Sequence, residues 1–376
     1  MVSTTHSPTD DRIFYREARS LSKMYEVTVI GKGPSDRVTT SGKITLVYLF
    51  APRILHVALV MKTFLYLMMQ RPRIIQCHEP DTLLLARLAS RLRTGTKVVY
   101  DVHEHFPSIW SYRRQLPVRL QSLIARVLDV FEKSLGTGVD AIVVVSDSIG
   151  KRFHFARPLG PVVVPNVPWK SNYDTAQLPH VRKRELTVLY GGNVDEDRGF
   201  REYSLALKIV SRRYPAVKFL IIGSLTIGRE LSRDLSAFLK RNGIERNLEV
   251  APWLSYFDYY KALCQAKVGV VLFQPTHTNN ILGLPNKLFD YMGAGIPVVA
   301  SDFPEIRKVV TQAKCGVLVD PSRPNEIAAA ISQLLSDREL NDRLGANGHG
   351  AVMSTYNWES VEDRYLNTYR SVLHVS

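Results

Sequence analysis

Residues 283–302 read Gly-Leu-Pro-Asn-Lys-Leu-Phe-Asp-Tyr-Met-Gly-Ala-Gly-Ile-Pro-Val-Val-Ala-Ser-Asp, and this stretch decides the fold. Proline stands where a helix begins and glycines stand where it ends, and the apolar run that follows predicts a buried parallel strand. Lys287 and Asp290 are three residues apart, so they share a face near the helix N-terminus. A helix N-terminus suits a phosphate, and a carboxylate accepts hydrogen bonds from sugar hydroxyls. The stretch is therefore typical of a nucleotide-sugar site, although a surface Lys and Asp also occur in other doubly wound proteins.

The composition indicates a globular protein of two domains. The chain has 376 residues, more than one ordinary domain, with 45% hydrophobic and 22% charged residues. Its three cysteines, Cys77, Cys264 and Cys315, are scattered, which argues against a disulfide framework or a zinc cluster and favours a reducing compartment. The polar N-terminus does not resemble a secretory signal, so we expect a cytoplasmic protein, with peripheral association with the inner face of the cell membrane left open.

The positive charge is concentrated in the first half of the chain. The net charge is +14, and residues 1–184 hold 27 Lys and Arg against 14 Asp and Glu, whereas the remainder is nearly balanced with 22 and 21. This asymmetry indicates an anionic partner, such as an anionic membrane surface, a phospholipid-type substrate or nucleic acid. No helix-turn-helix or aromatic RNA-binding motif accompanies the charge, so a nucleic-acid partner is not expected.

Residues 54–69 form the most apolar helical segment. They are fewer than the roughly 20 residues of a membrane-spanning helix, and they include His56 and Lys62. Two interpretations stay open: a buried crossover helix with basic ends, or a partly exposed helix that rests on a membrane.

Short apolar runs alternate with helical patterns in both halves, which predicts parallel βαβ units with both sheet faces covered. The expected strands are residues 26–30, 44–50, 74–77, 97–100, 141–145 and 161–164, then 187–190, 218–222, 248–250, 268–272, 297–300 and 316–319. The proline-containing, charged segment 168–185 is the expected linker between a domain of residues 1–167 and one of residues 186–356. Residues 357–376 predict an amphipathic helix whose apolar stripe packs in the core.

Several motifs, in order along the chain, resemble one enzyme family. They are the segment from Asp11 to Leu21, Tyr100-Asp-Val-His-Glu104, Val164-Pro-Asn-Val-Pro168, the segment from Leu189 to Gly199, and the opening stretch. With these the chain resembles the family-4 (GT4) retaining glycosyltransferases of the GT-B fold, in particular members of bacterial polysaccharide and lipopolysaccharide biosynthesis. The resemblance implies an α/β protein of two Rossmann-like, doubly wound parallel-sheet domains that face a cleft. The N-terminal domain would bind the acceptor, the C-terminal one the nucleotide sugar, and the last helix would cross back to the first domain.

The resemblance also places the donor cations. In the loop after the first strand of the C-terminal domain, it implies that Gly192 and Asn193 contact the donor and that Arg198 neutralises the departing diphosphate together with Lys287. Asn193 is a departure, because relatives carry a basic residue there. Asp195-Glu-Asp197 lies in this loop, but relatives bind no metal there, so neither a metal nor another cofactor is expected.

In the donor helix, Asp290 matches the second acid of the Glu-x7-Glu signature, which contacts the ribose. Gly283, Leu284 and Pro285 would line the phosphates, the first two through backbone N–H groups. Leu282 stands where the first acid is expected, so the contact to the donor sugar is unassigned. The polar side chains near it that are considered as substitutes are His277, Asn279 and Asn280.

His103 follows an apolar strand, and the resemblance implies that it faces the reacting sugar and positions donor or acceptor, with His105 the weaker candidate of the pair. Relatives begin with a full apolar strand, whereas only Met1-Val-Ser-Thr-Thr5 precedes His6 here, so either this strand is short or the start is truncated.

The sequence thus predicts a retaining glycosyltransferase that moves a sugar from a nucleotide-diphosphate sugar to a hydroxyl of a glycan or lipid-linked acceptor in cell-surface polysaccharide biosynthesis. One alternative is a sugar-nucleotide 2-epimerase of GT-B-like fold. Another is a non-catalytic basic protein that binds membranes or nucleic acid.

Overall fold

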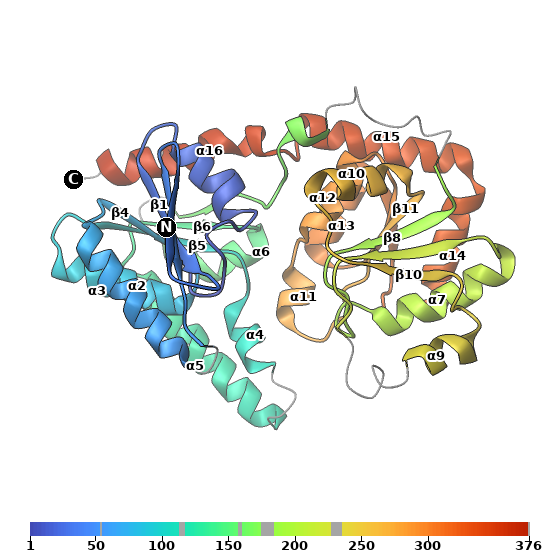
Figure 1. Cartoon of the computed structure of the whole chain (residues 1–376), viewed down its shortest axis with the longest axis horizontal. Coiled ribbons are helices and arrows are strands. Elements are labelled where there is room, and N and C mark those ends of the chain that lie inside the picture. The colour runs from blue at the N-terminus through green and yellow to red at the C-terminus, as the bar shows by residue number, and fades with distance from the viewer. Residues whose placement is uncertain (53–54, 113–116, 157–159, 174–183, 227–234, 375–376) are drawn as a thin grey trace. The chain divides into compact units, whose positions relative to one another are not determined.

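The computed structural model describes residues 1–376 except 53–54, 113–116, 157–159, 174–183, 227–234 and 375–376. The chain forms two compact units (Figure 1). Unit 1 comprises Met1–Asn166 and Val361–Ser376, and unit 2 comprises Val167–Ser360. The middle of the expected linker, residues 174–183, lies outside the described residues. Each unit contains a sheet that is mostly or wholly parallel and is covered by helices, as the alternation of apolar runs predicted.

The strands of unit 1 fall into two groups. In the first group, β1 pairs in parallel with β3, and β2 is antiparallel to β3; in the second, β4, β5, β6 and β7 follow one another in parallel. The strands are β1 (Val27–Lys32), β2 (Arg37–Ser41), β3 (Ile44–Leu49), β4 (Ile74–Cys77), β5 (Lys97–Val102), β6 (Ala141–Val144) and β7 (Pro161–Val163).

Val2 joins these two groups into one sheet. It forms parallel bridges with Ile30 of β1 and with Cys77 of β4. Its N–H donates to the carbonyl of Gln76 at 2.8 Å, and the N–H of Ser3 donates to the carbonyl of Ile30 at 3.0 Å. The place expected for a first strand is therefore taken by a single bridged residue.

Helices cover both faces of the unit 1 sheet. The helical segments are η1 (Ile13–Ala18, a π-helical turn), α1 (Arg19–Leu21), α2 (His56–Gln70), α3 (Pro80–Leu92), α4 (Phe106–Ser111), α5 (Val118–Gly136), α6 (Asp147–Gly150) and η3 (Lys151–Phe153). Helix α3 contacts α2 and α5, so these three form one layer on one side of the sheet (Figure 1). Helix α3 begins sharply because Pro80 is its first residue and Glu79 closes a capping box with Thr82.

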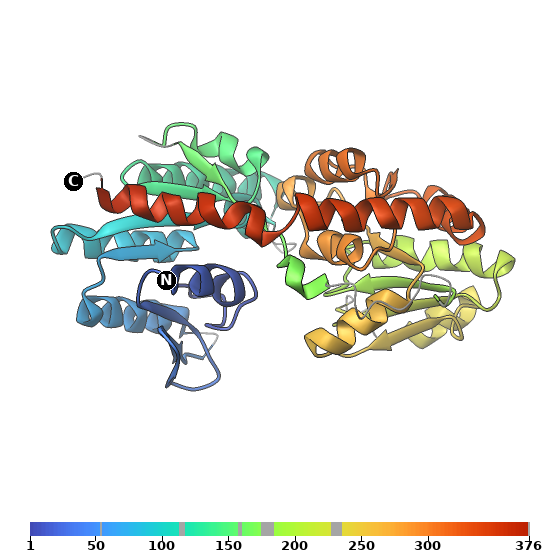
Figure 2. The ribbon, with the colours of Figure 1, turned by 90° about the horizontal axis from the view of Figure 1, so that it is seen from above.

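Helix α16 (Trp358–His374) lies on the other side of this sheet, beside η1 and α1 (Figure 2). Its residues from Val361 onward belong to unit 1. Trp358, Val361, Tyr365 and Tyr369 are buried, so the predicted apolar stripe does pack in the core.

The sheet of unit 2 is entirely parallel, with the order β10-β9-β8-β11-β12-β13. Its strands are β8 (Thr187–Gly191), β9 (Lys218–Ile222), β10 (Leu248–Ala251), β11 (Val268–Val271), β12 (Val298–Ser301) and β13 (Gly316–Val319). The strand order reverses between β8 and β11, and ligands of doubly wound sheets bind beyond the carboxyl ends of the strands at such a switch point. The loops after β8 and β11 are therefore the place to look for a ligand site.

The helices of unit 2 are η4 (Lys170–Tyr173), α7 (Phe200–Arg213), α9 (Leu235–Asn242), α10 (Tyr256–Gln265), α11 (Thr278–Leu282), α12 (Asn286–Gly293), α13 (Pro304–Ala313), α14 (Pro324–Ser336) and α15 (Arg338–Ser354). Helices α7 and α14 pack on β8, β9 and β11 in one continuous apolar core. The predicted strands all occur, with ends shifted by a residue or two, whereas β2 was not predicted. Within the described residues, we find no helix that is both long and apolar enough to cross a membrane.

Candidate functional site

Helix α12, which the opening stretch predicted, is held against the switch point by Tyr291. The Tyr291 hydroxyl accepts a hydrogen bond from the N–H of Gly191, the last residue of β8, at 2.8 Å. Its ring lies on Gly269 of β11, where a β-carbon would come within 2.4 Å of the ring. Only glycine permits this approach, so β8, β11 and α12 fit together at one point. The helix N-terminus follows an extended turn at Gly283 and Pro285, and its first N–H groups have no partner within the helix.

Lys287, in the first turn of α12, carries its amine into a buried position. The Nζ atom is buried and has no hydrogen-bond partner among the described residues. It lies 4.3 Å from the centroid of the Tyr190 ring and 5.8 Å from that of Phe273. Burial, and next the charge of Arg198, lower the pKa of Lys287 to about 7. A buried amine in this condition is stabilised by any anion that reaches it.

Gly192, in the loop after β8, lies beside this amine. Its φ of +92° is in the left-handed region that favours glycine, and a β-carbon there would lie 3.5 Å from Lys287 Nζ. The N–H of Gly192 donates to the carbonyl of Ile222 at 2.7 Å, which fixes the loop on β9. The next residue, Asn193, accepts a hydrogen bond through its side-chain oxygen from the Ser224 hydroxyl.

Arg198 lies in the same loop and is paired with Asp195. Its Nη1 is 2.6 Å from Asp195 Oδ2, and its N–H donates to Asp195 Oδ1 at 2.8 Å. The guanidinium carbon lies 5.7 Å from the centroid of the Phe273 ring, which Lys287 also faces. The Tyr190 hydroxyl donates to the carbonyl of Arg198 at 2.6 Å. The structure therefore brings Arg198, Lys287 and Gly192 together, and it uses Asp195 as the partner of an arginine.

Asp290 lies one turn along α12 from Lys287, as its spacing predicted, and it has a partner that the sequence did not reveal. The hydroxyl of Tyr173 in η4 donates to Asp290 Oδ1 at 2.7 Å. The Tyr173 ring packs on Gly293, where a β-carbon would come within 2.7 Å of it. Tyr173 thus fixes the orientation of Asp290 from outside the helix. No pattern in the sequence pointed to this tyrosine, because it precedes α12 by more than a hundred residues.

The segment before α12 is shaped by close backbone contacts. A β-carbon at Gly283 would lie 2.7 Å from the carbonyl oxygen of Asn279, so glycine permits the turn out of α11. The Asn280 side chain is buried, and its amide donates to the carbonyls of Asp197 and Gln274, both at 3.1 Å. Asn280 therefore has an internal role that ties two loops together, rather than the sugar contact considered for it from the sequence. Leu282 ends α11, with Leu284 and Pro285 between it and α12.

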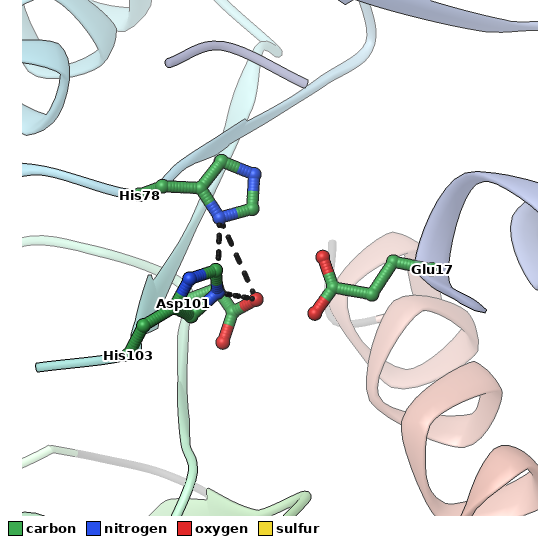
Figure 3. A group of neighbouring side chains, drawn as sticks. All are labelled: Glu17, His78, Asp101 and His103. Atoms are coloured by element: carbon green, nitrogen blue, oxygen red, sulfur yellow. Dashed lines mark hydrogen bonds and ion pairs between the residues drawn. The ribbon is translucent and has the colours of Figure 1, made fainter. Parts of the chain in front are cut away.

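His103 lies in unit 1, just beyond the end of β5, within a buried polar cluster (Figure 3). Its Nε2 atom is 2.8 Å from Asp101 Oδ2 and 3.2 Å from Nδ1 of His78. Only 12% of its side chain is exposed, whereas His78 and Asp101 are fully buried. Burial, and next the charge of His103, hold the pKa of His78 well below its usual value. His103 is thus the member of the cluster nearest to solvent.

The two carboxyl groups of this cluster differ in charge. Burial alone would raise the pKa of Asp101, but the Arg12 guanidinium, followed by His103, holds it well below its usual value. Burial, followed by the charge of Asp101, raises the pKa of Glu17 well above its usual value. Glu17 is therefore the protonated member and Asp101 the ionised one.

Glu17, His78, Asp101 and His103 also have the composition of a metal site, since one ligand atom from each lies within 4.8 Å of the others. Arg12, however, already supplies a positive charge. Its Nε is 2.7 Å from Glu17 Oε1, its Nη2 is 3.1 Å from Asp101 Oδ1, and its Nη1 donates to the carbonyl of Val164 at 3.0 Å. A divalent cation there would face the guanidinium at close range. The cluster fits an ion-pair network that orients His103 better than it fits a metal centre.

Gln76 connects this network to α16, a link that the sequence did not indicate. Its amide donates to Glu17 Oε2 at 2.8 Å and to Asp101 Oδ2 at 3.2 Å. Its oxygen accepts hydrogen bonds from the hydroxyls of Tyr365 and Tyr369. The tyrosines of the predicted apolar stripe therefore also serve as hydrogen-bond donors.

His105, the weaker candidate of the histidine pair, has a local role. Its Nδ1 accepts a hydrogen bond from the N–H of Ser108 and thereby caps α4.

Two family models match the chain, one in each half. The model for "Glycosyltransferase Family 4" matches residues 11–167, and that for "Glycosyl transferases group 1" matches residues 176–350. The chain belongs to the family-4 glycosyltransferases. The epimerase and the non-catalytic binding protein, considered as alternatives from the sequence, are not favoured by these matches.

Relatives of this chain that carry names are themselves glycosyltransferases. CapM of Staphylococcus aureus, a capsular polysaccharide biosynthesis glycosyltransferase, is 25% identical over 189 residues, which are 49% of this chain and 46% of that protein. The chain thus matches about half the length of CapM. The phosphatidyl-myo-inositol mannosyltransferase of Mycobacterium tuberculosis is 28% identical over 308 residues, which are 80% of this chain and 74% of that protein.

Solved structures of low sequence identity share the fold of this glycosyltransferase. Sucrose-phosphate synthase from Thermosynechococcus elongatus has a TM-score of 0.78 at 18% identity and covers 100% of this chain and 98% of its own. Anabaena HepE in complex with UDP has a TM-score of 0.71 at 14% identity, and the match covers 98% of each chain. The predicted GT-B fold, with two Rossmann-like domains, is confirmed.

Proposed function

We propose that the chain transfers a sugar from a nucleoside-diphosphate sugar to a hydroxyl of a glycan or lipid-linked acceptor, in the biosynthesis of a cell-surface polysaccharide or glycolipid. The buried Nζ atom of Lys287 carries this proposal, since it has no hydrogen-bond partner within the described residues. Arg198 and the N-terminus of α12 add positive potential beside it. A diphosphate completes such a site because its anionic oxygens accept the hydrogen bonds that no described residue accepts from Nζ.

The reaction breaks the bond between the anomeric carbon and the β-phosphate oxygen, and negative charge grows on the departing diphosphate. Lys287, Arg198 and the first N–H groups of α12 stabilise that charge electrostatically, so the step needs neither a metal nor another cofactor. The acceptor hydroxyl attacks from the face that the leaving group departs from, and its proton passes to the departing phosphate. The configuration of the anomeric carbon is then retained.

Recognition of the donor falls to the residues around α12. Asp290, oriented by Tyr173, accepts hydrogen bonds from the ribose hydroxyls. The backbone N–H groups of Gly283 and Leu284, with Pro285 beside them, line the phosphates. Gly192 lets the diphosphate approach the loop after β8, where Asn193 stands in place of the basic residue that relatives carry.

His103 positions the donor sugar or the acceptor from unit 1, and the Asp101–Arg12 pair holds its ring in place. We further propose that the chain works at the inner face of the cell membrane, in peripheral contact with it. The named activities of the two relatives are consistent with a saccharide or lipid-linked acceptor.

A donor screen tests the proposal. Purified protein is mixed with UDP, GDP and their common sugars, and the midpoint of thermal unfolding is measured. We expect one nucleoside diphosphate to raise it, an effect that Lys287→Ala abolishes. Lys240→Ala, which removes an exposed lysine from α9, should keep it. The absence of stabilisation by any nucleoside diphosphate would contradict the proposal, and conversion of the donor into another sugar without acceptor would identify an epimerase.

A further inference from the structure

Helix α2 presents an apolar row to solvent. Val57, Met61, Leu65 and Met69 recur every four residues, and between 52% and 75% of each is exposed. The opposite side of the helix is buried through Leu59, Thr63 and Leu67. The interpretation of this segment as a buried crossover helix therefore holds only for its inner side, which packs on the protein, whereas its outer side is left uncovered.

The neighbouring helices extend this row into a surface. On α3 the exposed apolar residues again recur every four positions, and on α5 they recur at helical spacing along one side. Because α3 contacts both α2 and α5, the three rows belong to one layer of unit 1 (Figure 1). We call this surface the apolar helical face: Val57, Met61, Leu65 and Met69 of α2, Leu84, Leu88 and Leu92 of α3, and Leu120, Leu123, Val127, Val130 and Phe131 of α5.

The charges around the apolar helical face are basic. Exposed arginines accompany the apolar rows: Arg71 and Arg73 just beyond α2, Arg91 on α3, and Arg119 and Arg126 on α5. On α5, Arg119 and Arg126 lie four residues before Leu123 and Val130, so they share the side that carries the apolar row.

The acidic groups of the same helices are already paired. Asp81 of α3 lies 2.9 Å from His56, and Asp129 of α5 lies 2.6 Å from Lys133. Glu132 is buried against Arg152. The charge that the apolar helical face presents outward is therefore positive, in agreement with the excess of Lys and Arg in residues 1–184.

We propose that the apolar helical face docks onto the surface of an anionic phospholipid bilayer. Aliphatic rows that enter the acyl boundary, with arginines at their margins on the headgroup phosphates, are the chemistry of an interfacial helix. A second copy of the chain fits less well, because a two-fold contact would bring these arginines toward one another. Nucleic acid would leave the aliphatic rows uncovered. Only the role of this docking rests on the proposed function: it would bring unit 1 to an acceptor that is embedded in the membrane.

Vesicle flotation tests the docking. The full-length protein is mixed with phosphatidylcholine vesicles with or without phosphatidylglycerol, and the bound fraction is measured at increasing salt. We expect binding to the phosphatidylglycerol vesicles and little to pure phosphatidylcholine. A triple variant Val57→Ser/Met61→Ser/Leu65→Ser changes only exposed side chains, so it should fold, and it should bind about tenfold or more weakly.

A charge variant separates the attraction of the arginines to anionic headgroups from the insertion of the apolar rows. Arg119→Gln/Arg126→Gln should lose the preference for phosphatidylglycerol, whereas Arg212→Gln/Arg213→Gln, which removes the same charge from exposed positions on α7 of unit 2, should keep it. Absence of binding by the unchanged protein, or full binding by the triple variant, would overturn the proposal. A self-association in light scattering that the triple variant abolishes, without any vesicle binding, would assign the face to a second copy instead.

The donor-induced thermal shift is measured on the same variants. It should be unchanged in the triple and charge variants, because the apolar helical face lies in unit 1 and the donor site in unit 2. Vesicle binding without any donor shift would contradict the proposed transferase and leave the docking standing. A donor-induced thermal shift without vesicle binding would contradict the docking and leave the proposed transferase standing.

Discussion

The amine of Lys287 lies 4.3 Å from the centroid of the Tyr190 ring, and its Nζ atom is buried without a hydrogen-bond partner among the described residues. The ring face offers a weak cation–π interaction, but it cannot replace the hydration that a full charge loses on burial. The result is a cation that the protein prepares for an anion and does not itself neutralise. This property makes the site testable by pH as well as by mutation.

The affinity for a nucleotide sugar should fall as the pH rises above 7. In the free protein the pKa of Lys287 is lowered to about 7, and a bound diphosphate returns it toward the ordinary value of 10.5. Between these values the complex holds a proton that the free protein has released, so binding takes up a proton. Titration calorimetry in buffers of different ionisation enthalpy measures this uptake directly. Binding that is independent of pH between 7 and 10, with no proton uptake, would show that Lys287 does not contact the diphosphate.

The same pKa predicts the stability of the unliganded protein. Between about pH 7 and 10.5 the unfolded chain holds a proton on Lys287 that the folded chain has released, so unfolding takes up a proton and this group makes stability rise with pH in that window. Lys287→Met removes the buried amine and should raise the melting temperature relative to the unchanged protein, most at pH 7 and below. A lower melting temperature at those pH values would indicate that the amine is well solvated.

Loss of either cation of the donor site should lower the turnover number. We expect Lys287→Ala or Arg198→Ala to reduce kcat about a hundredfold, because each removes charge stabilisation that grows as the diphosphate departs. Arg198→Lys should recover little, since a lysine lacks the planar guanidinium that lies over Phe273 while it bonds Asp195. Steady-state assays at saturating donor and acceptor measure kcat, and circular dichroism confirms folding. If both alanine variants keep full activity, the assigned roles fail.

Much of the fold could be predicted from the sequence, because buried strands carry an unmistakable apolar pattern. The strands β9 and β13 begin and end where the apolar runs do. Strand β2 was missed because its five residues are all exposed and carry no burial pattern; only pairing with β3 makes it a strand. In α2 the error went the other way: its sequence is apolar on both sides and indicated burial, although one side of this helix is exposed.

The site was predictable only as far as local sequence determines it. Lys287 and Asp290 follow from helical spacing, whereas Gly192 and Arg198 were placed by the family resemblance of the loop after β8. Tyr173 could not be found in this way, since it meets Asp290 only through folding. The same holds for the network of Gln76 with Tyr365 and Tyr369, whose hydroxyls look like ordinary parts of an apolar stripe.

The buried network around His103 predicts opposite outcomes for its two carboxyl groups. Asp101→Asn removes the anion that balances Arg12, so it should cost about 3 kcal/mol of unfolding free energy. Glu17→Gln replaces a protonated acid by a neutral group of nearly the same shape, so it should change stability by less than about 1 kcal/mol at neutral pH. The sign follows from the pKa directions: the low pKa of Asp101 stabilises the fold above its unfolded value, and this stability is lost as the pH falls. Urea denaturation measures the unfolding free energy of both variants. Equal losses in the two would contradict the assignment of the proton to Glu17.

The hydrogen bond from Tyr173 to Asp290 should act on donor binding rather than on the chemical step. Tyr173→Phe keeps the ring that packs on Gly293 and removes only the hydroxyl, so the fold should stay intact while the Asp290 carboxylate loses its fixed orientation. A net hydrogen bond to a carboxylate is worth about 1.5 kcal/mol, so KM for the nucleotide sugar should rise about tenfold with kcat nearly unchanged. Tyr356→Phe is a matched control, because it removes a tyrosine hydroxyl that bonds Gln312 of α13 and keeps the ring that packs on Phe289 of α12. An equal rise of KM in both variants, or a fall in kcat alone, would show that Tyr173 does not act through the ribose contact of Asp290.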